Sequence, residues 1–153
     1  SMDILSDGTM GFLGAGEQNI TILDSIGNIL LTKLIPNDRA FLKATKDNSF
    51  LVVGEKIAHI FPDGRVFETV VTGANNWVFG IAAQSQGAVV IGSFDEFNNQ
   101  FTQGIFRLIY TTPIPTIDET FTAKLFRPGT VTSLVLQEDG KIIAGGNFDF
   151  VNG

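Results

Sequence analysis

Short apolar segments separated by turn residues run along the whole chain. In four of them, turn residues precede an apolar run that ends at a glycine. These four copies are "SDGTMGFLG" (6–14), "KDNSFLVVG" (46–54), "SQGAVVIG" (85–92) and "EDGKIIAGG" (138–146). The shared turn position, which recurs at intervals of roughly 40 residues or more, is taken by Gly8, Asn48, Gly87 and Gly140. This spacing predicts an internal repeat that holds several short strands.

The second period is the most regular one. Alternating apolar residues and turn residues such as "PDG" (62–64) predict four strands, at 39–45, 49–55, 56–61 and 65–71. Four strands joined in a meander form one blade of a β-propeller. We therefore use this period as the template for the rest of the chain.

The other periods follow the template less completely. The first predicts three strands, in "TMGFLGAG" (9–16), "NITILD" (19–24) and "NILLTKLI" (28–35). The third predicts four, at 78–84, 88–94, 104–110 and 117–123, and the fourth predicts two, at 130–137 and 141–148. We therefore expect an all-β fold, a β-propeller or propeller fragment of about three and a half four-stranded antiparallel blades. Residues 1–153 form one array, with blades at approximately 3–36, 37–74, 75–128 and 129–153, the last incomplete.

Composition supports strands and limits the partners. The chain has 44% hydrophobic residues, 17 glycines and 14 phenylalanines, which suits a large core of strands and tight turns. The net charge is −6 and the basic residues are scattered, so we expect no nucleic-acid partner. Cysteine is absent, which excludes disulfides and cysteine-ligated metals. No apolar run approaches the roughly 20 residues that span a bilayer, so we expect no membrane insertion.

An incomplete propeller has open ends. Closed propellers hold about four to eight blades, and an open array leaves its first and last blades partly uncovered. We therefore expect either that the chain is a fragment of a larger propeller or that two copies form a homo-oligomer that completes one ring.

The second half of the chain carries a family resemblance. The stretches "VFGIAAQSQGAVVIGSFDEFNNQFTQGIFRL" (78–108) and "GTVTSLVLQEDGKIIAGGNFDFVNG" (129–153) resemble the delta-60 repeat, a β-propeller-like repeat of bacterial and phage proteins. The motif "IDETF" (117–121) is similar to the one that closes each such repeat, whereas "VVGEKIAHIFPDG" (52–64) lacks the phenylalanine-containing extension. The resemblance implies a non-catalytic scaffold of large secreted, cell-surface or virion proteins, with no catalytic residues to carry over.

Two equivalent loops are candidate metal sites. Oxygen-bearing side chains recur in "GSFDEFNN" (92–99) and "GNFDFVNG" (146–153), at Asp95 and Asn98 and again at Asp149 and Asn152. Carboxylate and amide oxygens suit a hard cation such as Ca²⁺. The alternative is an Asx-type turn, in which these side chains accept hydrogen bonds from nearby backbone groups.

The connection "GANNWVFG" (73–80) is a candidate ligand site. It places the single tryptophan, Trp77, beside Asn75 and Asn76 at a link between two predicted blades. An amphipathic ring flanked by amides suits a sugar or peptide contact. The alternative is that Trp77 packs between blades.

The remaining chemistry-bearing residues favour structural roles. His59 is the only histidine and lies between apolar residues of one predicted strand, so we expect it to be structural. Carboxylates that could serve a glycosidase occur in adjacent pairs at Asp95-Glu96, Asp118-Glu119 and Glu138-Asp139. Adjacent strand residues point to opposite faces, which argues against paired catalytic use.

We therefore expect a non-enzymatic structural or interaction module of a larger bacterial surface or phage virion protein. It would bind protein or glycan partners outside the cell, at the cell surface or in the virion. The alternatives are a carbohydrate-active enzyme that uses an acidic propeller channel and an intracellular propeller that assembles a complex.

Overall fold

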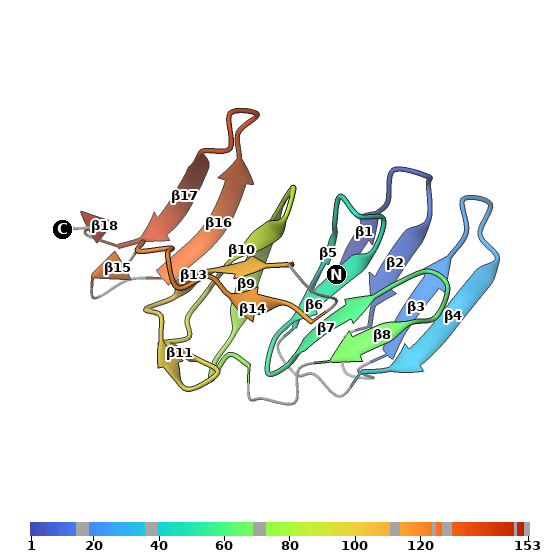
Figure 1. Ribbon diagram of the computed structural model, residues 1–153, viewed down its shortest axis with the longest axis horizontal. Helices are drawn as coiled ribbons and strands as arrows, with labels where there is room; N and C mark the ends of the chain where they lie inside the picture. Colours follow the sequence, from blue (N-terminus) through green and yellow to red (C-terminus); the bar gives the residue numbers. More distant parts are fainter. Residues whose placement is uncertain are drawn as a thin grey trace.

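The computed structural model of the chain is a row of antiparallel β-sheets (Figure 1). It describes residues 1–14, 19–35, 40–68, 73–110, 114–123, 125–126, 130–148 and 150–151. All regular elements in these ranges are strands. None of the described residues belongs to a helix long and apolar enough to cross a membrane. The expected all-β class is confirmed.

The first two sheets are four-stranded meanders. The first sheet is made of β1 (Met2–Ile4), β2 (Met10–Leu13), β3 (Asn19–Leu23) and β4 (Ile29–Leu34). The second is made of β5 (Phe41–Ala44), β6 (Phe50–Val53), β7 (Ile57–Ile60) and β8 (Val66–Glu68). The four strands predicted for the second period are confirmed. The three strands predicted for the first period are joined by a fourth, β1, which is only three residues long and carries no periodic signal.

The third sheet has an insertion. Its order is β9 (Val78–Gln84), β10 (Gly87–Gly92), β13 (Ile105–Ile109) and β14 (Thr116–Ile117). Between β10 and β13 lies a small hairpin, made of β11 (Glu96–Phe97) and β12 (Gln100–Phe101). The strand predicted at 117–123 is wrong beyond Ile117, because the backbone turns there and Phe121 N–H bonds to Asp118 O at 3.1 Å.

The fourth sheet has two described strands, β16 (Thr130–Leu136) and β17 (Ile142–Asn147). Beside it, β15 (Leu125–Phe126) pairs with β18 (Phe150–Val151). The first strands of successive sheets contact one another, β1 with β5, β5 with β9 and β9 with β16. The sheets therefore follow one another along the molecule in chain order, as Figure 1 shows.

The turn between the first and second strands of a sheet explains why a glycine or asparagine recurs at the shared repeat position in three of the four sheets. Gly8, Asn48 and Gly140 all have positive φ, of 85°, 59° and 83°, which glycine and asparagine tolerate best. The prediction that Gly87 takes the same position is wrong: Gly87 begins β10 after a two-residue turn at 85–86. Glycine is needed there for close packing instead, because a Cβ on Gly87 would lie 2.1 Å from the carbonyl oxygen of Leu108 in β13.

The core lies between the sheets. In β6, Phe50 and Val52 pack in the cluster shared with the first sheet, and Leu51 and Val53 pack in the cluster shared with the third. All four side chains are fully buried, because β6 is covered on both faces. In β10, Val90 faces the second sheet while Val89 faces the fourth. The two central sheets thus take part in every interface between neighbouring sheets.

One close backbone approach recurs in the third and fourth sheets. A Cβ on Gly92 would lie 2.1 Å from Trp77 O, and a Cβ on Gly146 would lie 2.1 Å from Thr130 O. Gly92 ends β10 and Gly146 is the last residue but one of β17, just before the segments that lead into β11 and β18. The third and fourth sheets therefore share a close backbone contact that only glycine fits.

Replacing Gly92 with alanine tests whether this close contact requires glycine. We expect Gly92→Ala to lower the free energy of unfolding by about 1–3 kcal/mol, because the added methyl group collides with a carbonyl oxygen. Gly14→Ala is the matched control, since the nearest atom to its Cβ is 3.7 Å away, and it should change stability by less than about 0.5 kcal/mol. Urea unfolding followed by tryptophan fluorescence measures both, and equal stabilities would contradict the assignment.

Candidate functional site

A small sheet forms at one end of the third sheet, where the sequence predicted two separate loops. Residues 73–75 run antiparallel to β11, with Ala74 opposite Phe97. Two backbone bonds extend this pairing, from Asn75 N to Glu96 O at 3.2 Å and from Asn98 N to Gly73 O at 3.1 Å. With β12 on its other side, β11 is the middle strand of a three-stranded unit, which we call the end sheet. Figure 1 shows β11 at the lower edge of the molecule.

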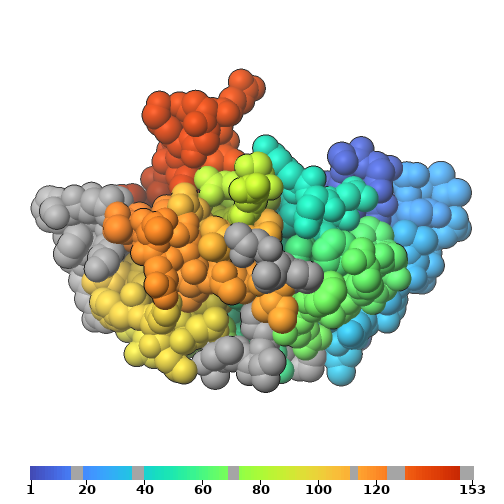
Figure 2. Space-filling view, in the orientation of Figure 1, coloured from blue at the N-terminus to red at the C-terminus, as the bar shows by residue number. Residues whose placement is uncertain are grey.

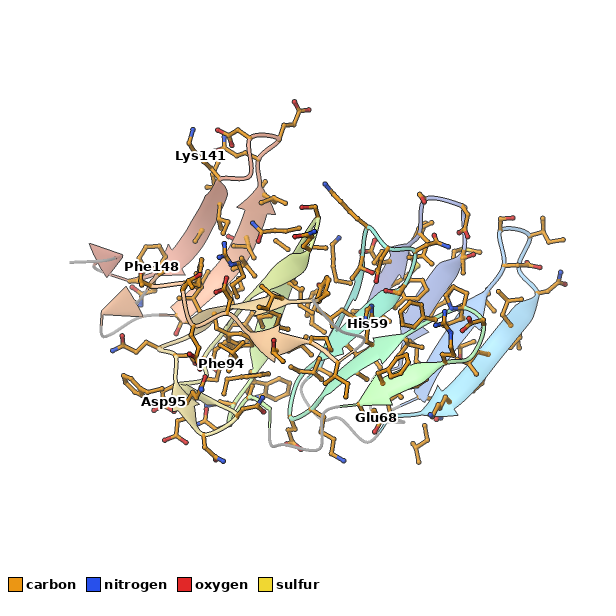
Figure 3. All side chains as sticks on the ribbon, in the orientation of Figure 1. His59, Glu68, Phe94, Asp95, Lys141 and Phe148 are labelled. Atoms are coloured by element: carbon orange, nitrogen blue, oxygen red, sulfur yellow. The ribbon has the colours of Figure 1, made fainter. Side chains whose placement is uncertain are left out.

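Phenylalanines attach the end sheet to the core. Phe94 and Phe97 are buried, and both contact the ring of Phe106 in β13, at centroid distances of 5.3 and 4.0 Å. Figure 3 shows Phe94 inside the molecule and its neighbour Asp95 at the lower edge beside β11. Phe148, which holds the same repeat position as Phe94, packs against the cluster between the third and fourth sheets. The end sheet is therefore held on a rigid support.

The outward face of the end sheet carries polar and aromatic side chains. Ala74 and Phe97 are buried, so the alternate positions Asn75 and Glu96 point outward, and both are exposed. Phe101 pairs with Glu96 across the hairpin and is more than half exposed. Asn75, Glu96 and Phe101 thus form one row across three strands, which we call the outer row.

The structure brings the two candidate sites of the sequence together. The Asn75 side chain donates from Nδ2 to Asp95 Oδ1 at 2.6 Å. Its Oδ1 accepts from Asp95 N at 3.2 Å and from Glu96 N at 3.3 Å. Asn75, predicted as a ligand residue, and Asp95, predicted as a metal ligand, therefore hold each other in place.

Trp77 and Asn76 complete this neighbourhood. Asn76 Oδ1 accepts the backbone N–H of Trp77 at 2.9 Å, and Trp77 O accepts from Ser93 N at 2.9 Å. The Trp77 side chain is more than half exposed. It therefore lies at the surface just before β9. The alternative, in which Trp77 packs between blades, does not fit this exposure.

The predicted metal ligands separate along the hairpin. Asp95 precedes β11, and Asn98 follows it in the turn, with a φ of 51°. The Asn98 Oδ1 atom is buried without a hydrogen-bond partner among the described residues. Asp149 and Asn152, the equivalents in the fourth repeat, lie outside the described residues. Within the described ranges no three histidine or acidic side chains gather in a metal-binding group.

A polar cluster surrounds His59, in which Thr45 and Ser49 are buried and Asp47 is exposed. Its Nε2 lies 2.5 Å from Ser49 Oγ and 3.3 Å from Asp47 Oδ2. Asp47 Oδ1 accepts from Ser49 Oγ at 2.6 Å and from Thr45 Oγ1 at 2.5 Å. Burial by itself would raise the pKa of Asp47, but the hydrogen bonds from Ser49 and Thr45 lower it overall. The sequence signal for this cluster was the "TKDNS" turn next to a strand that carries a lone histidine.

The His59 cluster is arranged for stability. In a serine hydrolase triad the carboxylate and the serine bond to opposite nitrogens of the histidine, whereas here both approach Nε2. Ser49 and His59 are also almost fully buried, and the His59 ring packs 5.5 Å from that of Tyr110. Burial and the Asp47 carboxylate raise the pKa of Tyr110. The cluster therefore joins the second sheet to the third.

Replacing Ser49 with alanine tests this role. We expect Ser49→Ala to cost about 1–3 kcal/mol of stability, because the buried His59 ring and the Asp47 carboxylate each lose a hydrogen-bond partner. Ser85→Ala, at the exposed turn between β9 and β10, is the control and should be nearly neutral. Thermal unfolding by circular dichroism compares the two. A neutral Ser49→Ala would show that the cluster adds nothing to the fold.

The other acidic pairs named by the sequence are engaged locally. Asp118 is buried and accepts from Thr120 Oγ1 at 2.6 Å and from Arg107 Nε at 2.5 Å. These bonds hold the pKa of Asp118 below its ordinary value. Asp139 accepts from Lys141 N at 3.0 Å and from Lys141 Nζ at 2.6 Å, at the exposed end of the β16–β17 turn.

The lowered pKa of Asp118 predicts a loss of stability in acid. The unfolded chain takes up a proton at this residue near pH 3.9, whereas folded Asp118 does so only at lower pH. Its contribution is therefore complete above about pH 5, begins to decline near the unfolded pKa and is lost as the pH falls through the folded pKa. Asp118→Asn should unfold more easily at pH 7 and show a shallower decline between about pH 4 and pH 2. Parallel declines, measured by urea unfolding at each pH, would contradict this.

A groove lies at the end of the molecule opposite the end sheet. It has a volume of about 530 Å³ and lies between the turns that join β9 to β10 and β16 to β17, with β13 alongside. Its charged side chains belong to Lys46, Arg107, Glu138 and Asp139. Figure 2 shows the red β16–β17 hairpin standing out from the surface beside the yellow-green β9–β10 turn. Since Arg107 and Asp139 are already ion-paired, we assign this groove no chemistry.

A comparison with protein-family models and with curated proteins finds no match to this chain. The similarity to the delta-60 repeat therefore depends on the residues quoted above. The candidate site is accordingly defined by the end sheet itself, that is, by its outer row and the adjoining Trp77.

Proposed function

We propose that the chain is a non-enzymatic interaction module with a β-propeller-type arrangement. Sheets that follow one another through contacts between their first strands support this arrangement. The resemblance of residues 78–153 to the delta-60 repeat supports a place in a bacterial surface or phage virion protein. In such a protein the module would present its end sheet on a rigid array.

We propose that the partner is a glycan. The observation that carries this proposal is the outer row, in which an amide, a carboxylate and an exposed aromatic ring lie side by side on three strands. Aromatic rings pack against the apolar face of a sugar, and the Glu96 carboxylate and the second Nδ2–H of Asn75 would bond its hydroxyls. The Asn75–Asp95 bonds hold the row in one conformation, which lowers the entropy cost of binding.

The alternative of a carbohydrate-active enzyme has less support. A glycosidase needs a general acid with a raised pKa, whereas the pKa of Asp118 is lowered by its hydrogen bonds to Thr120 and Arg107. Asp95 is bonded to Asn75 and Asp139 to Lys141. Each acidic pair therefore has a carboxylate that already serves local structure.

Binding to a glycan array tests the proposal. We expect the chain to bind a subset of glycans, and Trp77→Ala and Phe101→Ala each to weaken binding about tenfold or more, since loss of a stacking ring costs roughly 1–2 kcal/mol. Ile26→Ala is the control, because Ile26 is an apolar residue at the β3–β4 turn that is even more exposed than Trp77 and Phe101. Binding unaffected by either aromatic substitution, or capture of no glycan at all, would overturn the glycan assignment.

A further inference from the structure

The outer faces of the first and fourth sheets both carry exposed apolar side chains. The N-side face is the outer surface of the first sheet. It carries the polar side chains of Asn19, Thr21 and Thr32 together with the apolar side chains of Met2, Ile4, Met10, Phe12, Leu23, Ile29 and Leu34. The C-side face is the outer surface of the fourth sheet, centred on the cross-strand pair Val135 and Ile143. From these faces we infer that the chain associates head to tail with a second copy of itself.

The N-side face is composed like a buried interface. Met10 and Phe12 hold the repeat positions of Phe50 and Val52 in the second sheet, which are fully buried against the first sheet. On the N-side face no described residue covers the equivalent positions, and Ile4 and Ile29 are more than half exposed. Terminal units of a repeat array usually carry polar outer surfaces, whereas this face has more apolar than polar side chains.

The C-side face repeats the pattern. Ile143 holds the repeat position of Val89, and Val135 that of Ala82. In the third sheet Val89 is 0% and Ala82 is 7% exposed, because Val89 packs in the cluster with the fourth sheet and β9, which carries Ala82, contacts β16. In the fourth sheet Ile143 is 54% and Val135 is 59% exposed. The fourth sheet therefore keeps apolar residues at positions that are buried in the third sheet, although no described residue covers them here.

The internal interfaces indicate what fits each face. At every one of them, the C-side surface of one sheet packs against the N-side surface of the next. The described chain leaves one surface of each kind uncovered. The occupant of the C-side face is therefore the N-side face of a second copy, which continues the same packing between chains. Such a contact is heterologous, and two copies would place eight sheets in one ring, within the range of closed propellers. This ring depends on the propeller-type arrangement proposed above.

Two double variants test which faces meet. We call them blocked variants, because each places charges on one of the two faces. Ile4→Lys with Ile29→Glu places charges on the N-side face, and Val135→Lys with Ile143→Glu does so on the C-side face. The opposite signs avoid like-charge repulsion, and all four positions are exposed. Sedimentation equilibrium should give the unmodified chain at least twice its monomer mass and each double variant the monomer mass. An equimolar mixture of the two variants should form a pair, because each retains the face that the other lacks.

The remaining outcomes overturn the inference. Association of either variant alone would mean that like faces meet, and a monomeric unmodified chain at high concentration would mean that neither face binds a copy. Circular dichroism of each variant checks that it folds. Phe101→Lys is the matched control: it alters an exposed apolar residue away from both faces and should leave association unchanged. It should abolish glycan binding, whereas the blocked variants should keep it, so that failure of one proposal is distinguishable from failure of the other.

Discussion

Burial of both faces of the central sheets is the interaction on which the rest of the structure depends. Alternate side chains of a strand point to opposite sides, so β6 sends Phe50 toward the first sheet and Leu51 toward the third. The same alternation in β10 joins the third sheet to the fourth. Because each central sheet is a partner in two interfaces, the four sheets stack in chain order, and only the outer faces of the first and fourth remain uncovered by described residues.

The end sheet depends on that stacking and on close packing. Gly92 lets β10 pass within contact of Trp77 O, and Phe94 and Phe97 then fill the core beside Phe106. The backbone bonds of residues 73–75 to β11 hold the outer row on this support. A surface for recognition is thus built from short segments that would not be stable strands alone.

Much of the fold could be predicted from the sequence, because strand alternation and turn residues act locally. The second-sheet strands and the long strands of the third and fourth sheets lie where their apolar runs predict them. β1, β11 and β12 have two or three residues each, too few for a periodic signal. At the site, Asn75, Trp77 and Asp95 were singled out by residue type, whereas Phe101 was missed because an isolated surface phenylalanine resembles any core residue in sequence.

The sequence by itself determined the all-β class, the repeat, the turns at Gly8, Asn48 and Gly140, and the apolar strands that need neighbours. These features follow from backbone preferences and side-chain polarity within a few residues. Only the tertiary structure decided that Asn75 bonds to Asp95 across 20 residues, and that Asp47 lies against the buried side chains of Ser49 and His59. It also decided which apolar faces are covered. Such outcomes depend on which segments meet in space, and that is set by the packing of whole sheets.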